Sequence, residues 1–168
     1  MAAPLIQPEI TRATRDDIDG ILVLQEENQP ERNGMLSARL SRDWFEAALS
    51  DMPIIVARRE GRIVGYLVSA SRSAVADVPV IAAMLSAYPG AAGSYVYGPT
   101  CVAASERGNG IAAAMFGLLR ALQPGKEGIL FIRNDNGPSL GAHRRMGMRQ
   151  VAGFTHDGAD FSVFAYIG

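Results

Sequence analysis

The chain of 168 residues has one cysteine, one tryptophan and almost no net charge. A single Cys101 cannot form an internal disulfide. Sixteen Lys and Arg residues against 17 Asp and Glu give a formal net charge of −1, which argues against a nucleic acid or an anionic membrane surface as the partner. A small or neutral ligand fits this balance better.

Long hydrophobic runs are also missing. No stretch approaches the roughly 18 consecutive apolar residues of a membrane span. Residues 1–17 hold neither a basic leader nor the apolar core of a signal peptide. We therefore expect a cytoplasmic protein with no membrane partner, and we expect no bound metal.

What the chain does contain is enough apolar material for one sizeable core. Hydrophobic residues make up 48% of the 168 residues, and no internal repeat or low-complexity block divides them. The sequence therefore predicts one domain over residues 1–168.

The pattern of apolar residues, caps and turn residues predicts helices and strands in mixed order. They are a strand near Ile10, helices over 14–28 and 41–50, a hairpin over 54–71, a short helix over 80–88, a strand over 94–102, a helix ending at Leu122, a strand over 128–132, a helix over 138–146, and strands over 148–154 and 161–167. This order indicates an α+β protein (α/β, three-layer) with a mixed central sheet of six or seven strands and about four helices. The long connection over 72–94 is either a lid or a plain insertion.

The stretch "ERGNGIAAAM", residues 106–115, places two glycines directly before a helix that follows a strand. The first turn of such a helix offers free backbone N–H groups and the positive end of a dipole to an anion. Gly108 and Gly110 let the backbone approach a ligand closely, and Arg107 adds a forked cationic donor. A phosphate group is the natural guest.

Three alternatives compete for this loop. A P-loop is excluded because Gly110 is followed by Ile111 and Ala112 rather than by Lys and Ser or Thr. The letters "GNGIAA" match the looser dinucleotide pattern G-x-G-x-x-A, although the chain offers too few βαβ units for a Rossmann domain. A glycine turn with nothing bound is also consistent with the motif taken by itself.

Two longer stretches carry a resemblance. "VYGPTCVAASERGNGIAAAMFGLLRAL", residues 96–122, resembles the cofactor-binding motif of the GNAT N-acetyltransferase superfamily, a strand followed by an Arg/Gln-x-x-Gly-x-Gly/Ala loop and a helix. "NGPSLGAHRRMGM", residues 136–148, resembles a later segment of the same superfamily, an Asn followed by a helix and a closing glycine. The two motifs stand in the right order, and the expected element sequence covers nearly the whole chain.

The resemblance implies a GNAT-like, mostly antiparallel sheet with acetyl-CoA in a V-shaped opening between the strand ending at Val102 and the strand over 128–132. It implies that the backbone of Cys101, Val102 and Ala103 pairs with the pantetheine arm, and that the Val102 N–H stabilises the oxyanion. Asn136 matches the asparagine that contacts the cofactor. The residues implied to hold the pyrophosphate are Arg107, Gly108, Asn109, Gly110, Ile111 and Ala112.

His143 occupies the position where the superfamily commonly has a tyrosine that protonates the departing thiolate, and Met148 replaces a usual Phe. His143 belongs to a helical stripe that we expect to face inward. Its reference pKa of about 6.5 allows a charged donor near neutrality, which makes it the candidate general acid. The sequence assigns no general base.

Cys101 is an alternative acyl-accepting nucleophile. Strand alternation gives it the same face as Tyr95 and Tyr97, and no histidine is near in sequence, so we expect a buried, unreactive thiol. The predicted function is therefore direct transfer of an acetyl group from acetyl-CoA to a primary amine. A non-catalytic acyl-CoA-binding sensor or interaction module is the alternative, and a small NAD-binding domain is a weaker one. The sequence does not identify the acceptor, and it leaves a homodimer possible.

Overall fold

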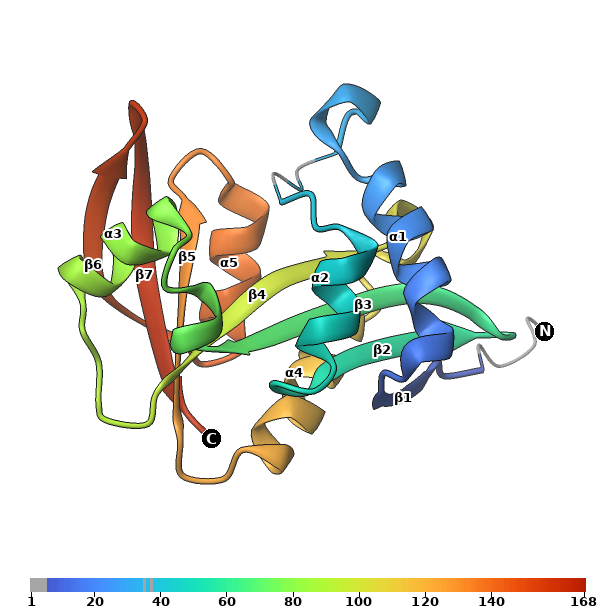
Figure 1. The fold of residues 1–168 in the computed structure, drawn as a ribbon. Coiled ribbons are helices and arrows are strands. Elements are labelled where there is room, and N and C mark those ends of the chain that lie inside the picture. Colours follow the sequence, from blue (N-terminus) through green and yellow to red (C-terminus); the bar gives the residue numbers. More distant parts are fainter. Residues whose placement is uncertain (1–5, 35, 37) are drawn as a thin grey trace. The chain divides into compact units, whose positions relative to one another are not determined.

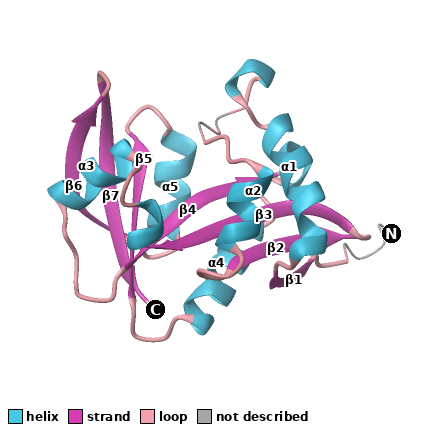
Figure 2. Cartoon of the chain, in the orientation of Figure 1, coloured by secondary structure: helices cyan, strands magenta, loops and turns pink. Residues whose placement is uncertain are grey.

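The computed structural model describes residues 6–34, 36 and 38–168. The described residues form seven strands and five α-helices (Figures 1 and 2). In chain order these are β1 (Glu9–Arg12), α1 (Ile18–Glu27), α2 (Arg42–Ala48), β2 (Ile54–Arg59), β3 (Arg62–Ser71), α3 (Pro79–Ala87), β4 (Tyr95–Val102), α4 (Ile111–Leu122), β5 (Glu127–Arg133), α5 (Gly137–Arg145), β6 (Arg149–His156) and β7 (Ala159–Ile167).

The strands form a mixed sheet in the order β1-β2-β3-β4-β5-β7-β6. The pairs β1/β2, β2/β3, β5/β7 and β6/β7 are antiparallel, whereas β4 and β5 are parallel. The predicted fold class is therefore confirmed. Five α-helices stand among the described residues, against the estimate of about four, and α3 lies where the sequence predicted a short helix over 80–88.

Local sequence signals explain where these elements begin and turn. Ser41 caps α2 by accepting a hydrogen bond from the Trp44 N–H (Oγ to N 3.1 Å). Glu60 and Gly61 turn the β2–β3 hairpin with φ of +52° and +77°, the pair of left-handed residues that a type I′ turn requires. Asp157 and Gly158 do the same between β6 and β7, with φ of +49° and +75°.

The chain divides into two compact units. The first holds the described residues up to Val68 together with Pro99–Leu119. In this unit α1 and α2 lie across β2 and β3 (Figure 1), and their apolar side chains share one buried cluster with Val56 and Tyr66. The opposite face of β3 lies against α4. A Cβ on Gly65, the residue before Tyr66, would meet Ile111 and Met115 of α4, because neighbouring strand residues face opposite sides of the sheet. The first unit therefore has three layers.

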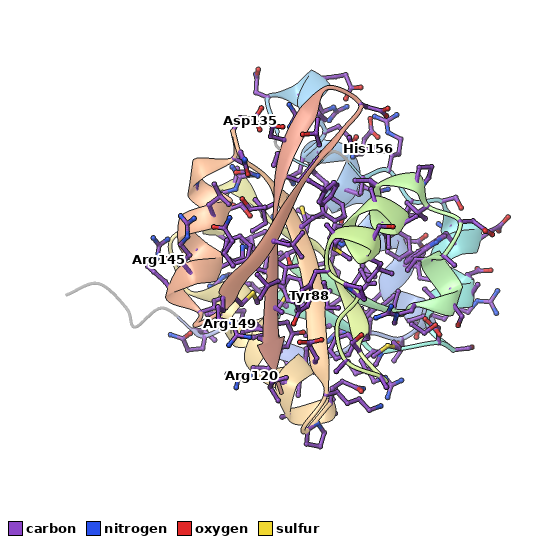
Figure 3. The ribbon with its side chains drawn as sticks, turned by 90° about the vertical axis from the view of Figure 1, so that its left-hand side faces the viewer. Tyr88, Arg120, Asp135, Arg145, Arg149 and His156 are labelled. Carbon is purple, nitrogen blue, oxygen red and sulfur yellow. The ribbon has the colours of Figure 1, made fainter. Side chains whose placement is uncertain are left out.

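The second unit holds Ser69–Gly98 and Arg120–Gly168. Figure 3 shows α3 and α5 on opposite sides of β6 and β7. Buried Glu127 of β5 accepts hydrogen bonds from the Ala91 N–H (2.8 Å) and the Tyr88 hydroxyl (2.9 Å). Arg72 donates to the Ser94 hydroxyl at 2.6 Å. These contacts fasten the 72–94 connection and favour the insertion over the lid.

Gly34 gives a test of the packing at the end of α1. A Cβ on this residue would overlap the backbone carbonyl of Asn28, which cannot move cheaply. We expect Gly34→Ala to lower the free energy of unfolding by about 1–3 kcal/mol, as overpacking commonly does.

The control is Gly117→Ala in α4, where a Cβ would meet no atom within 4 Å. Alanine there should raise the free energy of unfolding by about 0.5–1 kcal/mol through helix propensity. Urea unfolding of the two variants measures both effects, and an equally stable Gly34→Ala protein would contradict the packing at Asn28.

Candidate functional site

At the end of β4, the backbone N–H of Val102 points away from the neighbouring strand β3. The Ala103 N–H donates to the Val64 carbonyl of β3 at 2.8 Å, and the Ala103 carbonyl accepts from the Glu106 N–H at 2.9 Å. Because successive strand residues direct their N–H groups to opposite edges, the Val102 N–H points away from β3. Among the three residues predicted to meet a pantetheine arm, Val102 is therefore best placed to donate.

The loop after β4 begins with a 3₁₀ turn over Ala104–Glu106 that is anchored to β2. Arg59 donates from both Nε and Nη2 to the Glu106 carboxylate, at 2.8 and 3.0 Å. The hydrogen bonds from Arg59 hold the pKa of Glu106 below its ordinary value. Glu106 therefore fixes the start of the loop against β2.

The two glycines of the loop have left-handed backbone conformations, with φ of +83° at Gly108 and +75° at Gly110. A Cβ on either would meet no atom within 4 Å, so the space beside them is open in the described structure. The first helical hydrogen bond of α4 runs from the Ala114 N–H to the Gly110 carbonyl at 3.0 Å. The N–H groups from Ile111 to Ala113 therefore have no partner within the helix, which makes this end suitable for an anion.

The side chain of Arg107 makes two hydrogen bonds to protein groups, although the residue itself is exposed. Its Nη2 donates to Oδ1 of Asn28 at 2.7 Å, and its Nε donates to the Val102 carbonyl at 3.4 Å. Sequence reasoning missed Asn28, because 79 residues separate the two partners and no pattern links them.

Cys101 is buried beside Tyr66 in the cluster under α1 and α2. Burial raises the pKa of the Cys101 thiol to about 12. Gly98, which lies between Tyr97 and Cys101, has φ of +108°, so regular two-residue alternation does not extend across it. The expected burial of the thiol is confirmed.

The second unit contains the other two predicted site residues, both on or beside α5. Asn136 caps this helix, since its Oδ1 accepts from the Ser139 N–H at 3.3 Å. His143 is 7% exposed, as the inward-facing stripe predicted. Its Nδ1 lies 2.7 Å from the Ser139 carbonyl, which can only accept, so Nδ1 carries a proton.

The other ring nitrogen of His143, Nε2, lies 3.2 Å from the hydroxyl of Tyr97. Burial lowers the pKa of His143, although the hydrogen bond to Ser139 opposes this. The neutral ring then carries its proton on Nδ1, and Nε2 accepts from the Tyr97 hydroxyl. This differs from the charged donor that the reference pKa allowed, and the reason is burial. Tyr97 is a partner that the sequence did not indicate.

Among the described residues, no group of three or more His, Cys, Asp or Glu side chains is arranged to hold a metal ion. Among the helices described, none has the length and hydropathy needed to cross a membrane.

The architecture can be compared with known proteins. An N-acetyltransferase from Staphylococcus aureus Mu50 superposes with a TM-score of 0.70 at 19% identity, covering 96% of this chain and 99% of that one. The chain has the GNAT fold. A ribosomal-protein-alanine N-acetyltransferase from Brucella melitensis gives a TM-score of 0.67 at 22% identity, covering 95% and 99% of the two chains. Arabidopsis thaliana NAA60 in complex with acetyl-CoA gives a TM-score of 0.68 at 15% identity, covering 95% of this chain and 98% of that one.

No family model matches the sequence, and no curated protein matches it either. The GNAT fold therefore rests on the arrangement of the elements rather than on sequence identity, which is below 25% in each of these comparisons. It agrees with the fold that the two motifs implied.

The buried thiol gives a test of the strand that leads into the loop. Because the thiolate is the reactive form and burial raises the pKa of Cys101 to about 12, we expect the native thiol to react very slowly with iodoacetamide at pH 8. The unfolded chain in urea should react fully. Mass spectrometry measures both, and rapid labelling of the folded protein would contradict the placement of Cys101.

Proposed function

We propose that the protein is an acetyl-CoA-dependent N-acetyltransferase that moves an acetyl group directly to a primary amine. One observation carries the proposal. In a GNAT fold, an open glycine loop and the unpaired first turn of α4 follow a strand whose Val102 N–H points away from β3. The comparison proteins support it, because two of them are described as N-acetyltransferases and the third was solved with acetyl-CoA.

In this proposal the backbone of the loop binds the pyrophosphate of acetyl-CoA. Gly108, Gly110 and the first turn of α4 supply N–H donors and the positive end of the helix dipole. The strand end over 101–103 receives the pantetheine arm, with the Val102 N–H directed at the oxyanion that forms on the acetyl carbonyl. The Asn136 amide, whose Oδ1 is already used in the helix cap, contacts the cofactor through its Nδ2.

The state of Cys101 supports the direct route. An acyl-enzyme would need a thiolate, and a thiol whose pKa burial raises to about 12 is almost entirely protonated near neutral pH. The amine itself therefore attacks the thioester carbon, and CoA leaves as a thiolate.

His143 and Tyr97 handle the proton in this scheme. The proton lost by the attacking nitrogen goes to the Tyr97 oxygen, while the hydroxyl proton of Tyr97 passes to Nε2 of His143. The imidazolium keeps its Nδ1–H on the Ser139 carbonyl. The same path in reverse delivers the proton to the thiolate, so His143 acts as a general acid only after it has acted as a base.

Cofactor binding is the first test. We expect isothermal titration calorimetry to show one acetyl-CoA site per chain with micromolar affinity, and NAD to give no heat, because the loop lacks the βαβ context of a dinucleotide domain. No binding of acetyl-CoA at millimolar concentration would refute the proposal. NAD binding in its place would favour the dinucleotide alternative. Binding without acetylation of any amine in a broad panel would favour the non-catalytic sensor or interaction module.

The second test concerns His143. We expect His143→Ala to lower kcat by roughly 10² to 10⁴, the usual range for general acid–base catalysis, with the Kd of acetyl-CoA little changed. The resting ring must be neutral and burial lowers its pKa, so the kcat of the wild type should fall on the acid side, below about pH 6.5.

Tyr97→Phe should lower kcat similarly, because it keeps the ring and removes the hydroxyl that bonds Nε2. The control is Tyr95→Phe on the same strand, whose hydroxyl bonds Tyr166 at 2.6 Å instead. A His143→Ala enzyme with most of its kcat across this pH range would reduce His143 to a packing residue.

A further inference from the structure

Arg107 already uses the Nε–Nη2 edge of its guanidinium, which is well suited to bind an anion, for contacts with protein groups. Nε and Nη2 form the parallel pair of donors that grips a carboxylate or phosphate in two places. Arg59 uses this edge on Glu106. Arg107 uses the same edge on the Val102 carbonyl and on Oδ1 of Asn28. A two-point grip on a phosphate through this edge would break both of these contacts.

Asn28, the partner of Arg107, is fixed from several sides. It is 5% exposed, and its Nδ2 donates to the Leu24 carbonyl at 2.9 Å, which turns Oδ1 towards Arg107. Its backbone N–H donates to the Gln25 carbonyl at 3.2 Å, and its own carbonyl accepts from the Leu36 N–H at 3.1 Å. Asn28 is therefore a rigid acceptor.

Two neighbouring buried amides extend this anchorage along the segment that follows α1. Gln25 exchanges two hydrogen bonds with the backbone of Leu40, at 2.8 and 2.9 Å. Gln29 donates to the Ala38 carbonyl at 3.1 Å. We call Gln25, Asn28 and Gln29 the amide cluster. The amide cluster ties Leu36, Ala38 and Leu40 to the end of α1. Arg107 joins the glycine loop to the same cluster.

We propose that Arg107 is a positioning residue, which sets the glycine loop by bonding Asn28 rather than by contacting the phosphates. This inference rests on the proposed function and departs from the resemblance, which implied that Arg107 helps to hold the pyrophosphate. It also makes the end of α1 a determinant of cofactor affinity, although the cluster touches no phosphate. The loop and the segment after α1 are coupled through one hydrogen bond of 2.7 Å.

A double-mutant cycle on Arg107 and Asn28 tests the proposal, with calorimetric titration of acetyl-CoA as the measurement. Both Arg107→Ala and Asn28→Ala should weaken binding by roughly 10- to 100-fold, the range expected for loss of a hydrogen bond to a charged group. The double variant should be no weaker than the single ones, because the same contact is lost only once. In an enzyme assay, Arg107→Ala should raise the KM for acetyl-CoA and leave kcat almost unchanged.

Two conservative variants separate positioning from direct binding. Asn28→Asp keeps an acceptor for Arg107 but loses the Nδ2 donor to the Leu24 carbonyl, so its affinity should lie between those of the wild type and Asn28→Ala, whereas Arg107→Lys keeps the charge but not the paired donors and should behave like Arg107→Ala. The matched control is Arg15→Ala, which removes an exposed arginine paired with Glu46. Thermal unfolding of each variant shows that it is folded before titration.

The outcomes distinguish the two proposals. If the wild type does not bind acetyl-CoA, the proposed function fails and the inference fails with it. If the wild type binds and folded Asn28→Ala binds equally well while Arg107→Ala does not, Arg107 is a direct phosphate ligand and the inference alone is overturned. Additive losses in the double variant would overturn it too.

Discussion

The first turn of α4 leaves backbone N–H groups without helical partners, and the loop before it keeps them open. An unsatisfied donor is tolerated at a surface and costly when buried, so a loop that presents several donors must be held in place by other means. Here side-chain hydrogen bonds do this. Arg59 holds Glu106, and Arg107 bonds Asn28.

In the second unit too, polar groups are fixed by hydrogen bonds within the protein, here those of Ser139, His143 and Tyr97. The Ser139 carbonyl cannot donate, so it fixes the proton of His143 on Nδ1, and this in turn gives the Tyr97 hydroxyl its acceptor. A buried ring with both nitrogens satisfied is stable as a neutral base. In the first unit, the buried hydroxyl of Tyr66 differs, because it has no hydrogen-bond partner among the described residues. It lies beside the Cys101 thiol.

Most of the elements could be predicted from the sequence, since caps, turn pairs and apolar spacing act over a few residues. Ser41, Glu60-Gly61 and Asp157-Gly158 each stand where the sequence placed a cap or a turn. The inward face of His143 also followed from helical spacing. Alternation along β4 cannot be carried past Gly98, because a period of two holds only while the strand is regular and the φ of this glycine is +108°.

By itself the sequence determined the mixed fold, the glycine loop at the start of α4 and the burial of Cys101, because these depend on local backbone preference and hydrophobicity. The tertiary structure decided what the polar side chains do. Arg107 meets Asn28 across 79 residues, and Tyr97 meets His143 across 46. Which donor finds which acceptor depends on directions set by packing, and a hydrogen bond requires atoms within about 3 Å, so no pattern along the chain can specify the pair.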